Sequence, residues 1–285
     1  DAKSPVWMNK ISDGVYQLKV TTTADKNWFK FYAGSNFVSE DWDSINKGAL
    51  GCKENGSEDT FGYILYDGDS WGKLQTPVIP GAGTWIVTLD MNNLTYSVGK
   101  PVLYMKGDAN GWDGYDYLSG DDGVHFTGYM YLNQNGFKFC TQKDWKGTNY
   151  GANFDTAEGG ADIKMTEDAG YYKVDVDLSA KTYTLYPITS ISMIGDATPG
   201  GWDADTDLTY NATERCWEIK DVHLEAKELK FRSNHSWDDP NPNWGGTPDA
   251  LVQKGGNIKV AEDGKYDVKL YAWANGYAKC ELIKK

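Results

Sequence analysis

The sequence predicts an all-β protein made of tandem antiparallel β-sandwiches of the immunoglobulin-like class. Three observations lead to this prediction. Polar and apolar residues alternate at period two in nearly every segment that looks ordered, and Gly, Asn and Asp turns separate these segments. A long internal repeat, in which several of the 12 Trp and 19 Tyr residues recur, divides the 285-residue chain into similar parts.

The predicted strands are rich in Val, Ile, Tyr, Thr and Phe, as half-buried antiparallel strands are. Turn signals such as Asn135-Gly136 separate them, because Gly and Asn tolerate a positive φ. No long helical period competes with this pattern. The clearest expected strands are 84–89, 172–178, 182–186, 217–222, 258–260 and 266–270.

The repeat is strongest in the last two thirds of the chain. GDANGWD, FKFCTQKDW and NYG occur in one copy, and GDATPGGWD, LKFRSNHSW and NWG occur in the next. The two Gly-Trp corners, at Trp112 and Trp202, lie 90 positions apart, and Lys138 and Lys230 lie 92 apart. This spacing indicates a tandem duplication.

A fainter copy precedes these two and contains NWFKFYAGSN and Asp41-Trp42. It lacks a Gly-Trp corner, so we expect it to be divergent or truncated at its N-terminal side. Each repeat is large enough to form a small domain with its own core. We therefore predict three domains, which we call the first, second and third repeats: residues 1–100, 101–188 and 189–285.

Composition excludes several classes of function. A net charge of −13 argues against nucleic-acid binding, which requires clustered Lys and Arg. No apolar stretch has the length of a membrane span, and the N-terminus lacks the pattern of a signal peptide, so an exported form would have lost its leader. We expect a neutral or cationic partner.

We expect no metal and no cofactor. Four Cys without CxxC spacing indicate buried free thiols, although a Cys216–Cys280 bridge is left open. The Asp-rich corner cannot be an EF-hand, because Trp112 stands where the fifth loop position requires an oxygen ligand. Other calcium sites stay open, but most of these acidic residues are expected to be solvated turn residues. The three His residues occupy unrelated places and suggest no catalyst.

The candidate site combines aromatic rings with a cation. Residues two apart share one face of a strand, so the Phe pair that flanks Lys138 points into the core and Lys138 points outward. Lys230 and Lys30 occupy the same position in the other repeats. A loop Trp follows each of the two later Lys residues after seven positions, at Trp145 and Trp237.

Exposed indoles beside hydrogen-bonding groups suit a sugar, whose C–H face stacks on a ring while its hydroxyls need polar partners. The alternative is that these indoles belong to the core, as most Trp residues do. Trp112 and Trp202 are better placed for a surface role, since each lies between Gly and Asp in turn sequence. Tyr150 and Trp244 fit the rim of a site and loop packing equally well.

Together, these motifs resemble the SusE/SusF family of starch-binding outer-membrane lipoproteins from Bacteroidetes-type starch-utilisation systems. Residues 101–285 resemble it well and residues 13–99 more weakly. The resemblance implies tandem carbohydrate-binding modules without catalytic activity, normally carried behind an immunoglobulin-like domain and a lipidated Cys. It also implies a place on the cell surface beside other outer-membrane starch-utilisation proteins.

The family binds α-1,4-glucan over two aromatic residues, with Lys or Arg and polar side chains on the hydroxyls. The resemblance leaves open whether Lys230 or Arg232 makes this contact, because Cys140 stands where Arg232 does. It implies weaker binding by the first repeat, which lacks the Gly-Trp corner. The implied site residues are Trp112, Lys138 and Trp145 in the second repeat, Trp202, Lys230, Arg232 and Trp237 in the third, and Lys30 and Trp42 in the first.

The sequence thus predicts multivalent, non-catalytic binding of starch and maltooligosaccharides in support of glycan uptake. One alternative is a β-sandwich glycoside hydrolase, which would need two facing carboxylates. Another is a surface adhesin that binds a different glycan or has its aromatic residues buried.

Overall fold

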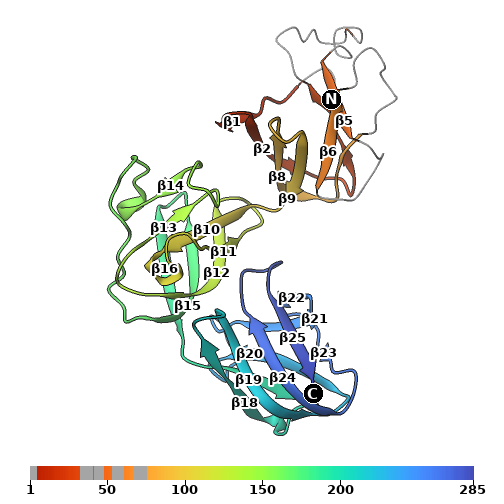
Figure 1. Ribbon diagram of the computed structural model, residues 1–285, viewed down its shortest axis with the longest axis vertical. Helices are drawn as coiled ribbons and strands as arrows, with labels where there is room; N and C mark the ends of the chain where they lie inside the picture. Colours follow the sequence, from red (N-terminus) through yellow and green to blue (C-terminus); the bar gives the residue numbers. More distant parts are fainter. Residues whose placement is uncertain (1–4, 33–40, 42–47, 53–60, 67–75) are drawn as a thin grey trace. The chain divides into compact units, whose positions relative to one another are not determined.

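The computed structural model describes residues 5–32, 41, 48–52, 61–66 and 76–285. Regular structure in these residues is almost entirely β-strand (Figure 1), with two single-turn 3₁₀ helices, η1 (Asp108–Asn110) and η2 (Ala152–Phe154). The predicted all-β class is confirmed. The chain forms two compact units: residues 1–101 with 121–123, and residues 102–120 with 124–285.

The first unit contains a seven-stranded antiparallel sheet in the order β1-β2-β8-β9-β6-β5-β4, and β3 pairs with β7. Alternation along β8 buries Trp85, Val87 and Leu89, which pack with Tyr96 and Val98 of β9. Its strands are β1 (Asn9–Ser12), β2 (Val15–Thr22), β3 (Asn27–Trp28), β4 (Phe31–Tyr32), β5 (Ala49–Cys52), β6 (Phe61–Tyr66), β7 (Val78–Ile79), β8 (Gly83–Asp90) and β9 (Thr95–Gly99).

The second repeat forms a seven-stranded sheet in the order β14-β13-β10-β11-β12-β15-β16. The Phe pair of β13 is buried as predicted, with the Phe137 and Phe139 rings 5.5 Å apart. The strands are β10 (Val102–Gly107), β11 (Asp116–Ser119), β12 (His125–Leu132), β13 (Phe137–Cys140), β14 (Asn149–Tyr150), β15 (Gly170–Asp177) and β16 (Thr182–Ile188).

The third repeat has the same topology. Its order β21-β20-β17-β18-β19-β24-β25 matches β14-β13-β10-β11-β12-β15-β16 strand for strand, with β22 added at the edge and β23 on β20. The duplication in sequence is therefore a duplication of strand order. The strands are β17 (Ile191–Gly195), β18 (Gly201–Asn211), β19 (Cys216–Leu224), β20 (Glu228–Ser233), β21 (Asn243–Thr247), β22 (Ala250–Gln253), β23 (Ile258–Lys259), β24 (Gly264–Tyr271) and β25 (Lys279–Lys284).

All six strands expected most clearly from the sequence are present. Four of them lie within β8, β16, β19 and β24, and the other two, 172–178 and 258–260, end one residue beyond β15 and β23. The four Cys residues are buried free thiols, so the open Cys216–Cys280 bridge is not formed. Burial raises the pKa of Cys140 and of Cys280 to about 12, which keeps both thiols protonated and unreactive at neutral pH.

The second and third repeats share packing. The Tyr171 hydroxyl donates to the carbonyl oxygens of Tyr129 and Ala272, each at 3.1 Å. The Tyr129 ring lies 5.2 Å from the Trp244 ring in an edge-on contact, and both Tyr residues belong to the hydrophobic core of the third repeat. Aromatic side chains of one repeat thus complete the core of the next.

An ion pair also joins these repeats. Arg215, in the turn between β18 and β19, donates to the Asp116 carboxylate of β11 and, at 3.1 Å, to the Tyr115 carbonyl oxygen. Asp116 also accepts a 3.0 Å hydrogen bond from Asn110 of η1. Burial raises the pKa of Asp116, and only the Arg215 guanidinium and the Asn110 amide offset this effect.

We expect Arg215→Met to lower the free energy of unfolding by about 3 kcal/mol, because it leaves the Asp116 carboxylate buried without its partner. Urea unfolding at pH 7 measures this change. The loss should shrink as the pH falls toward the ordinary pKa of Asp, where the carboxyl group becomes protonated and neutral. The double variant Arg215→Met with Asp116→Leu should recover stability, and equal stability of the wild-type and Arg215→Met proteins would contradict the role of this pair.

Candidate functional site

The third repeat presents two exposed indoles. Trp202 is the second residue of β18 and follows Gly201, whose φ of 59° turns the chain out of the preceding loop; Trp237 lies in the loop that follows β20. The two side chains are 40% and 42% exposed. Neither is a core residue, so both rings are free to contact a ligand.

Two cations lie beside one of these rings. Strand β20 buries Leu229 and Phe231, and so directs Lys230 and Arg232 to the opposite face, as the alternation predicts. Lys230 Nζ lies 5.3 Å from the centroid of the Trp237 ring, and Arg232 Cζ lies 4.9 Å from it. Both are close enough for cation–π attraction, which holds the ring in place.

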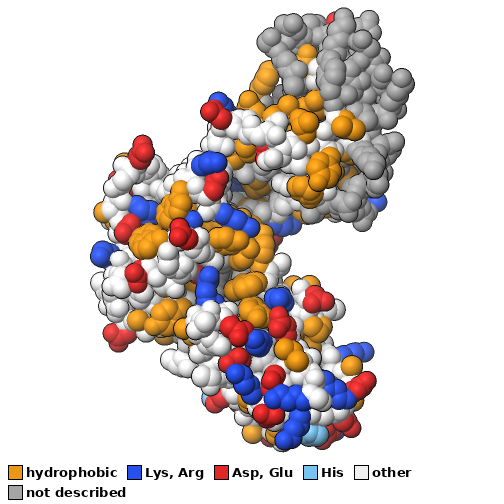
Figure 2. Space-filling view, in the orientation of Figure 1, with side chains coloured by type: hydrophobic (Ala, Val, Ile, Leu, Met, Phe, Trp, Pro, Cys, Tyr) orange, Lys and Arg blue, Asp and Glu red, His pale blue; other side chains and the backbone are white. Residues whose placement is uncertain are grey.

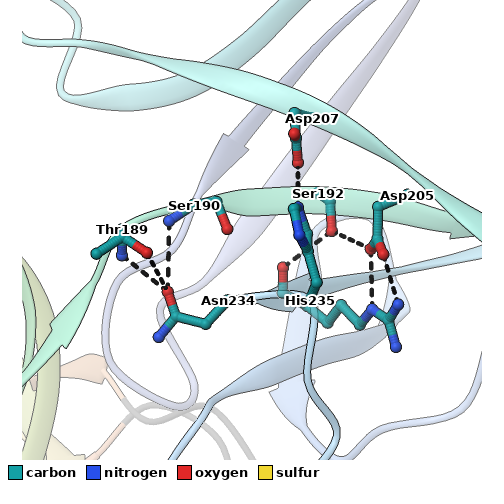
Figure 3. Close-up of polar contacts among 8 residues, drawn as sticks. Thr189, Ser190, Ser192, Asp205, Asp207, Asn234 and His235 are labelled. Atoms are coloured by element: carbon teal, nitrogen blue, oxygen red, sulfur yellow. Dashed lines mark hydrogen bonds and ion pairs between the residues drawn. The ribbon is translucent and has the colours of Figure 1, made fainter.

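The two cations differ in what else they bind. Arg232 donates to Asp205 from Nε at 2.9 Å and from an Nη atom at 2.5 Å, and Ser192 Oγ donates to the same carboxylate at 2.5 Å (Figure 3). The Arg232 contact holds the pKa of Asp205 below its usual range. Lys230 makes no ion pair or hydrogen bond with the described residues, and desolvation lowers its pKa. Of the two cations, Lys230 is therefore the one whose N–H donors are not used by the described residues.

The loop that carries Trp237 is anchored at its start. Asn234 Oδ1 accepts hydrogen bonds from the Thr189 backbone N–H at 2.8 Å and the Thr189 hydroxyl at 3.0 Å (Figure 3). His235 Nε2 lies 2.6 Å from Asp207 of β18. Asn234 and His235 both have left-handed backbone conformations, with φ of 50° and 51°. These contacts fix the direction in which the chain leaves β20 toward Trp237.

The second repeat brings its two indoles together. The Trp112 and Trp145 rings stack with centroids 6.2 Å apart and an interplanar angle of 29°. Each residue has a φ of 65°, a conformation that bulky side chains rarely adopt. Such strain persists only where surrounding contacts impose it, and it concentrates at functional sites. In this repeat the two predicted rings form one half-buried surface.

Hydrogen bonds hold the corner that carries Trp112. Asn110 Oδ1 accepts from the Gly107 backbone N–H at 2.9 Å, and Asn110 Nδ2 donates to the Met105 carbonyl oxygen at 3.0 Å. The same amide donates to Asp116, which is bound by Arg215. The corner is therefore tied both to β10 and to the third repeat.

The cation beside this pair is not the predicted one. Lys138 Nζ donates to the Gly160 carbonyl oxygen and lies 3.5 Å from Asp162, so it is already occupied by its own loop. Lys106 Nζ instead lies 4.4 Å from the Trp145 centroid and donates to the Lys143 carbonyl oxygen at 2.7 Å. Lys106 and Lys138 are direct neighbours across β10 and β13. The repeat did not indicate Lys106, because Ile194 is at the matching position of the third repeat.

The remaining predicted residues are placed as follows. Trp244 is 1% exposed within the core, so it cannot line a surface site. Tyr150 is half-buried, with its ring 6.1 Å from Phe154, and packs against the core of the second repeat. Lys30 lies between β3 and β4, next to the buried Phe31. Trp42 lies outside the described residues.

Acidic residues near the corner are bound by other side chains. Asp108 accepts hydrogen bonds from Asn133 at 2.9 Å and Asn135 at 2.8 Å, and these lower its pKa. Among the described residues, no group of three or more His, Cys, Asp or Glu side chains could hold a metal ion.

An antiparallel β-sandwich that presents indoles beside a cation has the architecture of a carbohydrate-binding module. The model of one such family, described as SusF, first starch specific CBM, matches residues 1–100. The expected resemblance to the SusE/SusF family is confirmed by this match, which falls in the repeat where the motifs are faintest. A solved structure, SusF from Bacteroides thetaiotaomicron, aligns over 96% of this chain and 68% of that chain, with 20% identity and a TM-score of 0.39. The curated proteins contain no match.

We expect the Asp205–Arg232 pair to make the stability of the third repeat depend on pH. The pKa of Asp205 is depressed in the folded state, so its contribution is complete above the ordinary Asp pKa of 3.8 and is lost as the pH falls through the folded value. Melting temperatures of the wild type and Asp205→Asn should therefore differ most at neutral pH and converge below about pH 3.8. Asp203→Asn, at an exposed neighbouring position, is the matched control and should melt like the wild type.

Proposed function

We propose that this protein binds starch and maltooligosaccharides, without catalysis, at the aromatic surfaces of its repeats. The observation that carries the proposal is the arrangement of the third repeat, in which Trp202 and Trp237 are exposed and Lys230 has unused donors beside Trp237. The match of residues 1–100 to a starch-specific binding module supports the choice of ligand.

The chemistry follows from the two kinds of group. An indole face offers a flat apolar surface for the C–H face of a glucose ring, and an ammonium group donates hydrogen bonds to the hydroxyls at the edge of that ring. Lys230 supplies these donors in the third repeat. Arg232 acts through Trp237, because its own guanidinium is bound to Asp205.

The carboxylates around this site favour binding over hydrolysis. A glycosidase needs a general acid with a raised pKa facing a second carboxylate. Asp205 has a lowered pKa and is bound by Arg232, and Asp207 is bound by His235. The lowered pKa of Asp205 is the opposite of what a general acid requires.

Several sites on one chain would raise the avidity for a polymer, because the second binding event becomes intramolecular. The first repeat contributes a site in this proposal, with Lys30 and Trp42 as its predicted residues, and the match to a starch-specific module supports its inclusion. Its lack of a Gly-Trp corner still predicts weaker binding than in the third repeat.

The proposed place of action is the outer face of the outer membrane, next to other starch-utilisation proteins. No helix among the described residues is long and apolar enough to cross a bilayer. Attachment through a lipidated Cys, outside this sequence, is part of the proposal and rests on the family resemblance.

Affinity electrophoresis tests the proposal. The wild-type protein should be retarded in gels that contain amylopectin or pullulan and not in gels that contain dextran or xylan. Trp202→Ala with Trp237→Ala should reduce the retardation, and adding Trp112→Ala with Trp145→Ala should reduce it further, because each pair removes stacking surface.

The matched control is Ile283→Ala, which shortens a side chain of similar exposure in the third repeat and should leave retardation unchanged. Deleting the side chain of a core Trp typically lowers the free energy of unfolding by roughly 3 to 5 kcal/mol. The melting temperatures of these variants should fall by much less than such a loss would cause. Equal retardation of the quadruple variant and the wild type would disprove the role of these rings. Release of reducing ends from maltoheptaose would disprove binding without catalysis.

A second measurement separates the two cations of the third repeat. In a background with Trp112→Ala and Trp145→Ala, Lys230→Ala should weaken maltoheptaose binding by about tenfold without changing the melting temperature, since it removes a charged donor. Arg232→Ala should lower the melting temperature, because the Asp205 side chain, which is only 13% exposed, is left without its charged partner. Calorimetric titration and thermal unfolding measure the two effects. The opposite pattern would assign the sugar contact to Arg232.

A further inference from the structure

A second group of aromatic side chains lies where the second and third repeats meet. Tyr104 and Tyr117 are direct neighbours across β10 and β11, with ring centroids 5.8 Å apart. The connection between β24 and β25 adds Tyr277, whose ring stacks on Tyr117 at 4.3 Å and 12°, and Trp273, whose ring lies 6.0 Å from Tyr117. Tyr104 and Tyr117 come from the second repeat, and Tyr277 and Trp273 come from the third.

Lys143 connects this group to the Trp112–Trp145 pair. Its carbonyl oxygen accepts from Lys106, whose Nζ lies over Trp145. Its own Nζ lies 4.8 Å from the centroid of Tyr115 and 5.6 Å from that of Tyr117. Lys143 therefore contacts both groups: its carbonyl oxygen is linked to the indole pair through the buried Lys106, and its ammonium group lies beside the tyrosines.

This surface is accessible. Tyr277 is 36% exposed and Lys143 is exposed, while Tyr115, Tyr117 and Trp273 are half-buried. Figure 2 shows hydrophobic side chains on the surface over β10 and β11 and beside the β24–β25 connection. Ring faces and an ammonium group are also the groups of the proposed sugar site, and tyrosine hydroxyls can add hydrogen bonds to a sugar.

A contact that serves only to join the repeats looks different. Tyr131 and Tyr210 also stack across the junction, at 5.7 Å and 6°, but both pack against the core of the third repeat and no described cation lies over them. Tyr117, Tyr277 and Trp273 belong to neither hydrophobic core of this unit, and Lys143 lies beside Tyr117. Their position outside the cores leaves a ligand role open to them.

We propose that the glucan site of the second repeat continues from Trp112 and Trp145 past Lys143 onto Tyr117, Tyr277 and Trp273. The third repeat thus completes the site of the second. A short maltooligosaccharide occupies only the indole pair, whereas a longer α-1,4-glucan also covers the tyrosines. This extension rests on the proposed function, because it assumes that the indole pair binds glucan.

The test compares short and long ligands on the full chain with the third site removed by Trp202→Ala and Trp237→Ala. Calorimetric titrations with maltotriose and with maltodecaose give the two dissociation constants. Tyr277→Ala should weaken maltodecaose binding by about tenfold, the effect of losing one stacked ring, and leave maltotriose binding unchanged. Tyr131→Ala is the matched control, since it removes a stacked tyrosine from the same junction, and it should leave the ratio of the two constants unchanged.

The outcomes separate the two proposals. A loss confined to maltodecaose in Tyr277→Ala supports the extension. An unchanged ratio in Tyr277→Ala, or an equal change of the ratio in Tyr131→Ala, overturns the extension while the function stands. If the protein with all its Trp residues intact binds neither ligand, the proposed function fails and the extension with it.

Discussion

The alternation of side chains along β13 and β20 is the constraint on which the rest of this structure depends. One face of each strand supplies Phe137 and Phe139, or Leu229 and Phe231, to a core. The opposite face must then carry Lys138, Lys230 and Arg232, because successive residues of a strand point to opposite sides. The core residues and the outward cations are thus supplied by the same two short strands. A shift of register by one position would exchange the two faces and destroy both.

The second and third repeats depend on each other through groups that are distant in sequence. Arg215 binds Asp116, and Asp116 binds the Asn110 amide that shapes the Trp112 corner. Tyr171 and Tyr129 fill the core on the other side of the junction. Removing the two charges of this ion pair from water costs free energy, which offsets much of their attraction. The pair therefore contributes more to fixing the contact between the two repeats than to the free energy of unfolding. The Trp112 corner of the second repeat is therefore held in place by a side chain of the third repeat.

Local pattern was enough to predict the strands, the buried Phe pairs and the outward cations, since each follows from residues two positions apart. The turn sequence around Trp112 and Trp202 predicts a surface role for both, which agrees with the exposure of Trp202, whereas Trp112 is half-buried. Contacts between side chains on different strands could not be predicted in this way. Lys106 reaches Trp145 only because β10 pairs with β13, and Asp205 engages Arg232 only because β17 lies between their strands. Trp244 is buried because a ring of the preceding repeat covers it, and nothing in the NWG motif records that neighbour.

The left-handed backbone conformation of Trp112 and Trp145 limits how far the thermal stability of this protein can be raised while both indole rings are kept. Glycine or asparagine would adopt a φ of 65° with less strain than tryptophan does, so replacing either residue would relax the chain locally. Engineering or laboratory evolution that rewards only heat resistance would thus tend to remove the rings. Selection for heat resistance and selection for the proposed glucan binding therefore favour different residues at these two positions, and a screen that is to keep both properties must select for both at once.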